Sequence, residues 1–144
     1  MPPPQQDVID RPWKACAYGD LERLQSFLQS DPACIHRPGE DGYYPLQWAS
    51  LNNRASIVHF LVEKGVRVNS VDHTGQSALH WAAVTGSIQA ADALLRAGAT
   101  LELQDNKGYT PCHVAAQYGQ TLFCYHLAVR WNADVDRVDS DGRT

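Results

Sequence analysis

Side chains that could bind a metal ion gather in the last third of the chain, where Cys112, His113, Cys124 and His126 occur. Structural zinc sites take their ligands in pairs, with members roughly two to four residues apart. Cys112 and His113 are adjacent, so in a helix their side chains point to different sides and do not reach one ion together. We therefore predict that this chain holds no metal.

The residue pattern supports no other chemistry. No serine, histidine and acid stand together in a nucleophile motif, and no glycine-rich loop of the phosphate-binding kind occurs. Asp134, Asp136, Asp139 and Asp141 cluster near the C-terminus, where they are typical of a solvated surface, with weak calcium binding a remote alternative. We predict no catalytic residue and no cofactor within this chain.

The bulk composition is that of an ordinary globular domain, since 44% of the 144 residues are hydrophobic and 19% are charged. The 12 basic and 16 acidic residues give a net charge of −4, which argues against a nucleic-acid-binding surface. No apolar run approaches the roughly 20 residues of a membrane-spanning helix, and the N-terminus lacks a secretion signal. The cysteines at 16, 34, 112 and 124 are therefore expected to be reduced thiols in a cytosolic setting.

A repeated structural unit must position these side chains. Three segments align without gaps: residues 41–53, 74–86 and 107–119. Their leading glycines, Gly42, Gly75 and Gly108, are 33 residues apart, and Gly142 follows after 34. A period of about 33 residues with the pattern Thr-Pro-Leu-His-x-Ala-Ala is typical of ankyrin repeats. We predict an all-α ankyrin-repeat solenoid, in which stacked helix-turn-helix units carry β-turns at their tips.

Local signals fit this assignment, because Ser77 and Thr110 stand at helix N-cap positions and Pro45 and Pro111 suit first helical turns. The chain divides into a disordered N-terminus (1–10), a degenerate first repeat (11–40), three full repeats (41–73, 74–106 and 107–140) and the start of a truncated next repeat (141–144). The last segment, Asp-Gly-Arg-Thr, opens a unit that it does not finish. We therefore expect the chain to be part of a longer protein.

In an ankyrin stack the first helices and the turn tips line one concave surface, which is where a partner would bind. Two positions of each first helix lie one turn apart on this face. They hold Trp48 and Asn52, then Trp81 and Thr85, then Val114 and Tyr118, while Tyr43, Gln76 and Tyr109 stand at the tips. Exposed tryptophan is unusual, and Trp and Tyr dominate binding hot spots at about 2 kcal/mol or more each. We predict a peptide-binding surface made of Asn52, Trp81, Trp48, Thr85, Tyr43, Tyr118 and Tyr109.

A purely structural role is the alternative for several of these side chains. Trp48 and Trp81 could pack edge-on against the next repeat, since tryptophan is seldom fully buried, although we favour the binding role. Tyr43 and Tyr109 fit either role. Tyr118 could equally seal the gap between repeats.

Several stretches are more specific than the repeat signature. They are residues 46–54 (LQWASLNNR), 72–81 (DHTGQSALHW), 113–120 (HVAAQYGQ) and 131–134 (WNAD). With the closing Asp-Gly-Arg-Thr they resemble the N-terminal ankyrin domain of the DHHC-type protein S-acyltransferases (palmitoyltransferases), most closely the plant tip-growth type. In that family, membrane-spanning helices and a cysteine-rich domain follow, and the enzyme transfers a fatty acyl group from acyl-CoA to cysteine thiols of substrate proteins. The resemblance implies a larger enzyme whose acyl-CoA site and structural zinc lie outside this chain.

The resemblance also implies a ligand and a location. The family's ankyrin domain recruits substrates by an extended peptide in which β-branched residues precede Gln-Pro. Its peptide-holding residues match Asn52, which would grip the peptide backbone, and Trp81, on which the proline would lie. The domain would face the cytoplasm at the Golgi, another endomembrane or the plasma membrane, without entering the bilayer. Two residues depart from the family pattern: Gln47 replaces the histidine that His80 represents, and Val114 replaces a third tryptophan.

A stand-alone ankyrin adaptor or inhibitor, with no enzyme in the same chain, is the alternative function. The sequence beyond residue 144 would separate the two, because an S-acyltransferase continues into apolar spans and a cysteine-rich segment. Leu122, Tyr125 and Val129 form an apolar stripe on the last predicted helix, so self-association through this end of the stack is a further expectation.

Overall fold

The structure, a computed structural model, describes residues 10–133, and within this range the chain forms helices and no strands. The helices are α1 (Pro12–Tyr18), α2 (Leu21–Ser30), α3 (Pro45–Leu51), α4 (Ala55–Glu63), α5 (Ala78–Thr85), α6 (Ile88–Arg96), α7 (Pro111–Gln117) and α8 (Thr121–Trp131). The predicted all-α ankyrin-repeat fold is confirmed. The segments predicted as disordered (1–10) and as the start of a further repeat (141–144), and the aspartates from Asp134 to Asp141, lie outside the described residues apart from residue 10.

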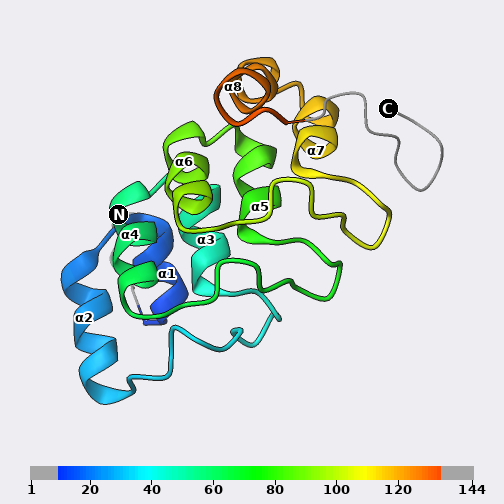
Figure 1. The fold of residues 1–144 in the computed structure, drawn as a ribbon. Helices are drawn as coiled ribbons and strands as arrows, with labels where there is room; N and C mark the ends of the chain where they lie inside the picture. Colours follow the sequence, from blue (N-terminus) through cyan, green and yellow to red (C-terminus); the bar gives the residue numbers. More distant parts are fainter. Residues whose placement is uncertain (1–9, 134–144) are drawn as a thin grey trace, which may run out of the picture.

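The helices stack in pairs (Figure 1). The first helices α1, α3, α5 and α7 form one row in which each packs against the next. The second helices pack against their own partners, and α4 also packs against α6. The loops that join one pair to the next extend together to one side of the stack (Figure 1). This arrangement places the same position of successive repeats side by side.

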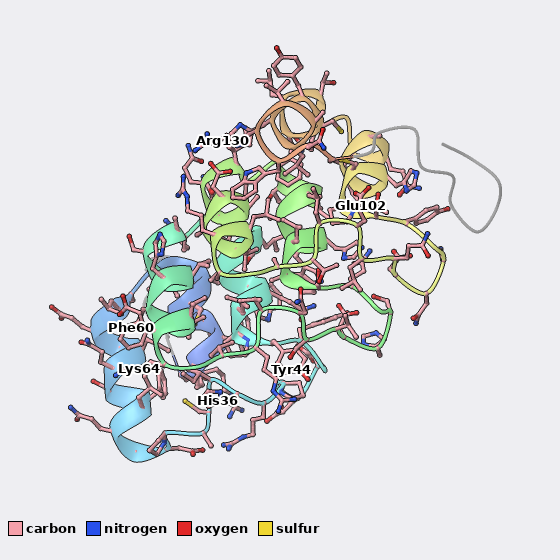
Figure 2. All side chains as sticks on the ribbon, in the orientation of Figure 1. His36, Tyr44, Phe60, Lys64, Glu102 and Arg130 are labelled. Carbon is pink, nitrogen blue, oxygen red and sulfur yellow. The ribbon has the colours of Figure 1, made fainter. Side chains whose placement is uncertain are left out.

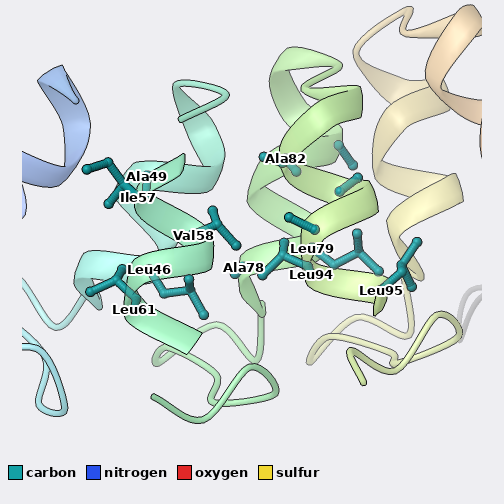
Figure 3. Packing of buried hydrophobic residues seen from close by; sticks show 14 of the residues in the cluster. Leu46, Ala49, Ile57, Val58, Leu61, Ala78, Leu79, Ala82, Leu94 and Leu95 are labelled. Atoms are coloured by element: carbon teal, nitrogen blue, oxygen red, sulfur yellow. The ribbon is translucent and has the colours of Figure 1, made fainter. Parts of the chain in front are cut away.

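The core runs continuously through the stack (Figure 3). Each second helix contributes fully buried aliphatic side chains, such as Leu61 on α4 and Leu94 on α6. Alanines at the contact between first helices, Ala49, Ala82 and Ala115, are 0% exposed. Because these side chains are small, neighbouring helices approach closely, and their larger neighbours fill the space behind them.

The predicted helix starts are confirmed. The Thr110 hydroxyl caps α7 by accepting the His113 N–H, and Ser77 precedes α5 as its N-cap. Pro45 and Pro111 occupy the first turns of α3 and α7, where a missing backbone N–H costs no helical hydrogen bond.

The second helices form the outer face of the stack. On α4, the Lys64 ammonium lies 5.4 Å from the centre of the Phe60 ring and so places a charge over this apolar side chain (Figure 2). On α8 the stripe of Leu122, Tyr125 and Val129 is 76%, 67% and 67% exposed. The corresponding residues of α6 are Gln89, Asp92 and Arg96, so this exposed apolar stripe belongs to the last repeat alone among the described full repeats. No described helix is both long and apolar enough to cross a bilayer.

The four side chains first considered for metal binding make separate contacts. His113 takes part in the capping of α7, and the Cys124 thiol lies 3.6 Å from the Cys112 carbonyl oxygen. His126 pairs with Asp92 at 2.7 Å. Within residues 10–133, no three or more histidine, cysteine, aspartate or glutamate side chains are grouped so that they could hold a metal ion.

Candidate functional site

Four aromatic rings form one half-buried surface across the first three repeats. Trp48 of α3 and Trp81 of α5 lie edge to face, with ring centroids 5.3 Å apart. Tyr43, at the tip before α3, lies 4.8 Å from Trp81, and Trp13 of α1 stacks on Trp48 at 4.6 Å. All four side chains are partly exposed. We call Trp13, Tyr43, Trp48 and Trp81 the aromatic cluster; its rings pack against one another and still present surface to a ligand.

Trp13 is the member of the cluster that sequence reasoning missed. Gly19 after α1 and Asn53 after α3 both have a left-handed backbone, so they mark equivalent positions of the first two repeats. The residues six positions before them, Trp13 and Gln47, are therefore in register. The same count places Lys14 in register with Trp48. Because Gln47 is buried, this alignment points to Lys14 and gives no signal for Trp13, which only the structure places in the cluster.

Asp72 fixes the position of Trp81. The Trp81 indole N–H donates to Asp72 Oδ2 at 3.0 Å, and the Gln47 amide donates to the same oxygen at 3.1 Å. The other oxygen, Oδ1, accepts from the backbone N–H groups of Thr74 and Gln76, at 2.9 and 3.1 Å, and closes the turn at the repeat tip. One carboxylate therefore ties the turn to helices of two repeats.

The ionisation state of Asp72 follows from these bonds. Burial acts to raise the pKa of the carboxyl, but hydrogen bonds from Thr74, Gln76 and Trp81 outweigh it and hold the pKa below its ordinary value. The group is thus a charged acceptor at neutral pH. Because the Trp81 N–H is already engaged, this indole offers a ligand its ring face rather than a hydrogen bond.

Gln47 makes the same two backbone hydrogen bonds as the histidine at the equivalent position of the next repeat. In the third repeat, His80 Nδ1 accepts the Ser77 N–H at 3.1 Å, so Nε2 carries the proton and donates to the Tyr109 carbonyl at 2.9 Å. Burial lowers the pKa of His80 and so favours this neutral form. Gln47 makes the equivalent pair of bonds, accepting the Tyr44 N–H at 2.8 Å and donating to the Gln76 carbonyl at 2.8 Å.

This equivalence predicts the effect of two substitutions at Gln47. Gln47→Leu should lower the free energy of unfolding by about 2 to 3 kcal/mol, because it leaves the Tyr44 N–H and the Gln76 carbonyl without their buried partner. Gln47→His should retain most of the stability, since imidazole makes the same two bonds in the next repeat. Urea unfolding followed by circular dichroism measures both. Equal losses for the two variants would show that the amide bonds contribute little.

Asn52, the C-cap of α3, and Thr85, the last residue of α5, differ in what they offer a ligand. Both are exposed. Asn52 Nδ2 donates to the Trp48 carbonyl at 2.9 Å, which leaves Oδ1 and a second N–H without a partner among residues 10–133. The Thr85 hydroxyl lies 2.6 Å from the Leu51 carbonyl and 2.7 Å from Ser87 Oγ. Asn52 can therefore bond a peptide backbone, whereas Thr85 contributes mainly its methyl group.

The two predicted tyrosines of the fourth repeat differ in exposure. Tyr109 is 8% exposed and has little surface left for a peptide. Tyr118, 59% exposed, follows α7 as its C-cap. Val114, in register with Trp81, is buried at 2% exposure. The structure thus brings Tyr43, Trp48 and Trp81 together beside Asn52 and Thr85, the latter one turn along α5 from Trp81, whereas Tyr109 and Tyr118 lie in the next repeat.

A hollow of about 460 Å³ borders the aromatic cluster at its N-terminal edge. Trp13, Tyr43 and Trp48 form part of its wall, with Lys14 and Arg37 among the charged residues around it. Lys14 Nζ pairs with Asp10 at 2.7 Å and lies 5.6 Å from the centre of the Trp13 ring. The surface available to an extended ligand therefore continues past Trp48 toward α1.

Comparison with known proteins identifies the repeats. A family profile described as ankyrin repeats (three copies) matches residues 13–105, and one described as ankyrin repeat matches residues 107–140. Ankyrin repeats are protein-interaction modules. The matches cover all eight helices apart from the first residue of α1.

Three relatives with curated names share sequence similarity with this chain. Probable protein S-acyltransferase 23 of Arabidopsis thaliana is 42% identical over 142 residues, which cover 99% of this chain and 26% of that protein. NAD-capped RNA hydrolase NUDT12 of Macaca fascicularis is 31% identical over 52% of this chain and 16% of that protein. Palmitoyltransferase AKR1 of Naumovozyma castellii is 33% identical over 46% of this chain and 9% of that protein.

The chain thus spans about a quarter of the Arabidopsis relative and smaller parts of the others. Two of the three are acyltransferases by name, and the predicted resemblance to ankyrin-containing S-acyltransferases is confirmed. Because the two ankyrin profiles match residues 13–105 and 107–140, the chain belongs to the ankyrin-repeat family.

Proposed function

We propose that this chain binds an extended segment of a partner protein on the surface formed by Tyr43, Trp48, Trp81 and Asn52, and that it thereby recruits substrates for cysteine S-acylation by a larger enzyme. The observation that carries the binding proposal is the aromatic cluster, because its indole rings are held side by side while remaining partly exposed. Tryptophan and tyrosine are among the residues most enriched in binding hot spots.

The geometry suggests how the segment would be held. Successive residues of an extended chain advance by about 3.3 Å, so the 5.3 Å between the Trp48 and Trp81 rings corresponds to about two residues. A proline ring would lie flat on the Trp81 face, where no hydrogen bond is needed. The Asn52 amide, one turn along α3 from Trp48, would bond the peptide main chain.

The acylation part of the proposal rests on the Arabidopsis relative, whose similarity extends over 99% of this chain. Acyl-CoA, structural zinc and the catalytic residues would belong to other parts of such an enzyme. The ankyrin region would then face the cytoplasm beside a Golgi, other endomembrane or plasma membrane. Its role would be to hold the substrate protein near the acyl-transfer site.

Calorimetric titration with two synthetic peptides tests the proposal. The first peptide carries two β-branched residues followed by Gln-Pro, and the second differs only by alanine in place of the proline. We expect the first to bind at least about 10-fold more tightly, because alanine cannot cover the Trp81 face. Equal binding of both peptides, or binding of neither, would contradict the proposal.

A further inference from the structure

We propose that Asp72 is the positioning residue of this peptide-binding surface: its second carboxylate oxygen holds the Trp81 indole in the orientation that receives the ligand. The inference rests on the proposed function and adds to it the residue that prepares the site. Asp72 is 7% exposed, so it acts through Trp81 rather than by touching the peptide.

The two oxygens of Asp72 have separate tasks. Oδ1 serves the turn, since it accepts from the Thr74 hydroxyl at 2.6 Å as well as from the backbone N–H groups of Thr74 and Gln76. Oδ2 serves the helices, because it accepts from Trp81 Nε1 at 3.0 Å and from Gln47 Nε2 at 3.1 Å. A change confined to Oδ2 would therefore affect the binding surface more than the turn.

The next repeat shows that the turn does not need the indole bond. Asp105 Oδ1 accepts from the backbone N–H groups of Lys107 and Tyr109, both at 2.9 Å, in the same turn. Its Oδ2 accepts from Gln76 Nε2 at 3.3 Å, and the residue in the place of Trp81 is Val114, which has no donor. Among the described repeats, the bond from a turn carboxylate to a first-helix tryptophan is thus a feature of the Asp72 repeat, and it holds a ring of the aromatic cluster.

The consequence for binding is preorganisation. A partly exposed indole can adopt several side-chain rotamers. If only one of them binds the ligand, the apparent affinity is reduced by the fraction of molecules in the other rotamers. The charged hydrogen bond to Asp72 fixes the ring before the ligand arrives, and the ring contacts with Tyr43 and Trp48 hold the same orientation.

Asp72→Asn is the selective test, because its amide keeps one oxygen for the turn and turns an NH₂ group toward the donors of Trp81 and Gln47. Asp105→Asn is the matched control in a turn of the same kind. Affinity for the Gln-Pro peptide is measured in both variants, and Asp72→Asn is repeated in a Trp81→Phe background, which has an aromatic face and no N–H. We expect Asp72→Asn to weaken binding about 5- to 10-fold. Asp105→Asn should change it less than about 2-fold, and Asp72→Asn should add nothing in the Trp81→Phe background.

Equal effects in both backgrounds, or equal effects of Asp72→Asn and Asp105→Asn, would overturn the inference. If Asp72→Asn fails to fold by circular dichroism, Trp81→Phe alone decides, because loss of the anchoring N–H should still weaken binding several-fold. The indole ¹H–¹⁵N signal of Trp81 gives a readout without peptide and should shift in Asp72→Asn but not in Asp105→Asn. Absence of peptide binding to the unsubstituted chain would instead refute the proposed function.

Discussion

Replacement of Trp81 by alanine is expected to weaken binding of the Gln-Pro peptide by about 30-fold while the helical fold is retained. Truncation of a central tryptophan in an interface typically costs about 2 kcal/mol or more, and about 1.4 kcal/mol corresponds to a factor of ten in affinity. Trp81 packs against both Tyr43 and Trp48 in the aromatic cluster. Its removal takes away the face on which the proline would lie.

A tryptophan outside the proposed surface provides the control for this experiment. Trp131 is also half-buried and also donates its indole N–H to an aspartate, Asp92, at 2.8 Å, but it lies at the end of α8. Trp131→Ala should therefore affect stability and leave peptide affinity unchanged. Calorimetry and circular dichroism measure the two properties. Unchanged affinity in Trp81→Ala would exclude the groove assignment, and collapse of the helical signal would show that Trp81 serves packing alone.

The repeat architecture could be predicted because the helix-capping residues, first-turn prolines and turn glycines recur at the same spacing in successive repeats. Thr110 caps α7 as predicted, and His80 bonds the backbone of the next turn as its position in the pattern requires. Asn132 adopts the left-handed conformation after α8, with φ of +61°. These features depend on neighbours in sequence or on the fixed offset between repeats, and both are visible in a single sequence.

The contacts of the aromatic cluster depend on three-dimensional packing and were harder to predict. Trp13 lies in a repeat that lacks the entry motif, so the alignment of the other repeats did not include it. The role of Asp72 was hidden because its turn function is shared with Asp105, and only the structure shows which donors reach the second oxygen. Tyr109 occupies a tip position in the pattern, yet its side chain is buried. Position in a repeat predicts location along the stack better than it predicts exposure.

Substitution of Gly75 by alanine is expected to give the largest loss of stability among single changes at the repeat tips. Gly75 has φ of +81°, and an added Cβ would lie 2.8 Å from the Asn106 backbone nitrogen and 2.4 Å from its Oδ1. That nitrogen donates to the Thr74 carbonyl at 3.0 Å, so it cannot move without breaking the contact between successive tips. The left-handed backbone costs about 1 to 2 kcal/mol for alanine, and the clash should raise the total loss to about 3 kcal/mol or more.

Gly98→Ala separates the two causes, because Gly98 has φ of +99° and no atom within 4 Å of an added Cβ. Its expected loss is the backbone cost alone, about 1 to 2 kcal/mol, and urea unfolding of both variants measures the difference. Equal losses of unfolding free energy would show that the added Cβ at position 75 is accommodated without a steric cost. Because the Gly75 turn also contains Asp72, the surviving folded Gly75→Ala chain should bind the Gln-Pro peptide more weakly than Gly98→Ala does. A fall in stability without this fall in affinity would mean that the tip contact supports the stack but does not set the position of Trp81.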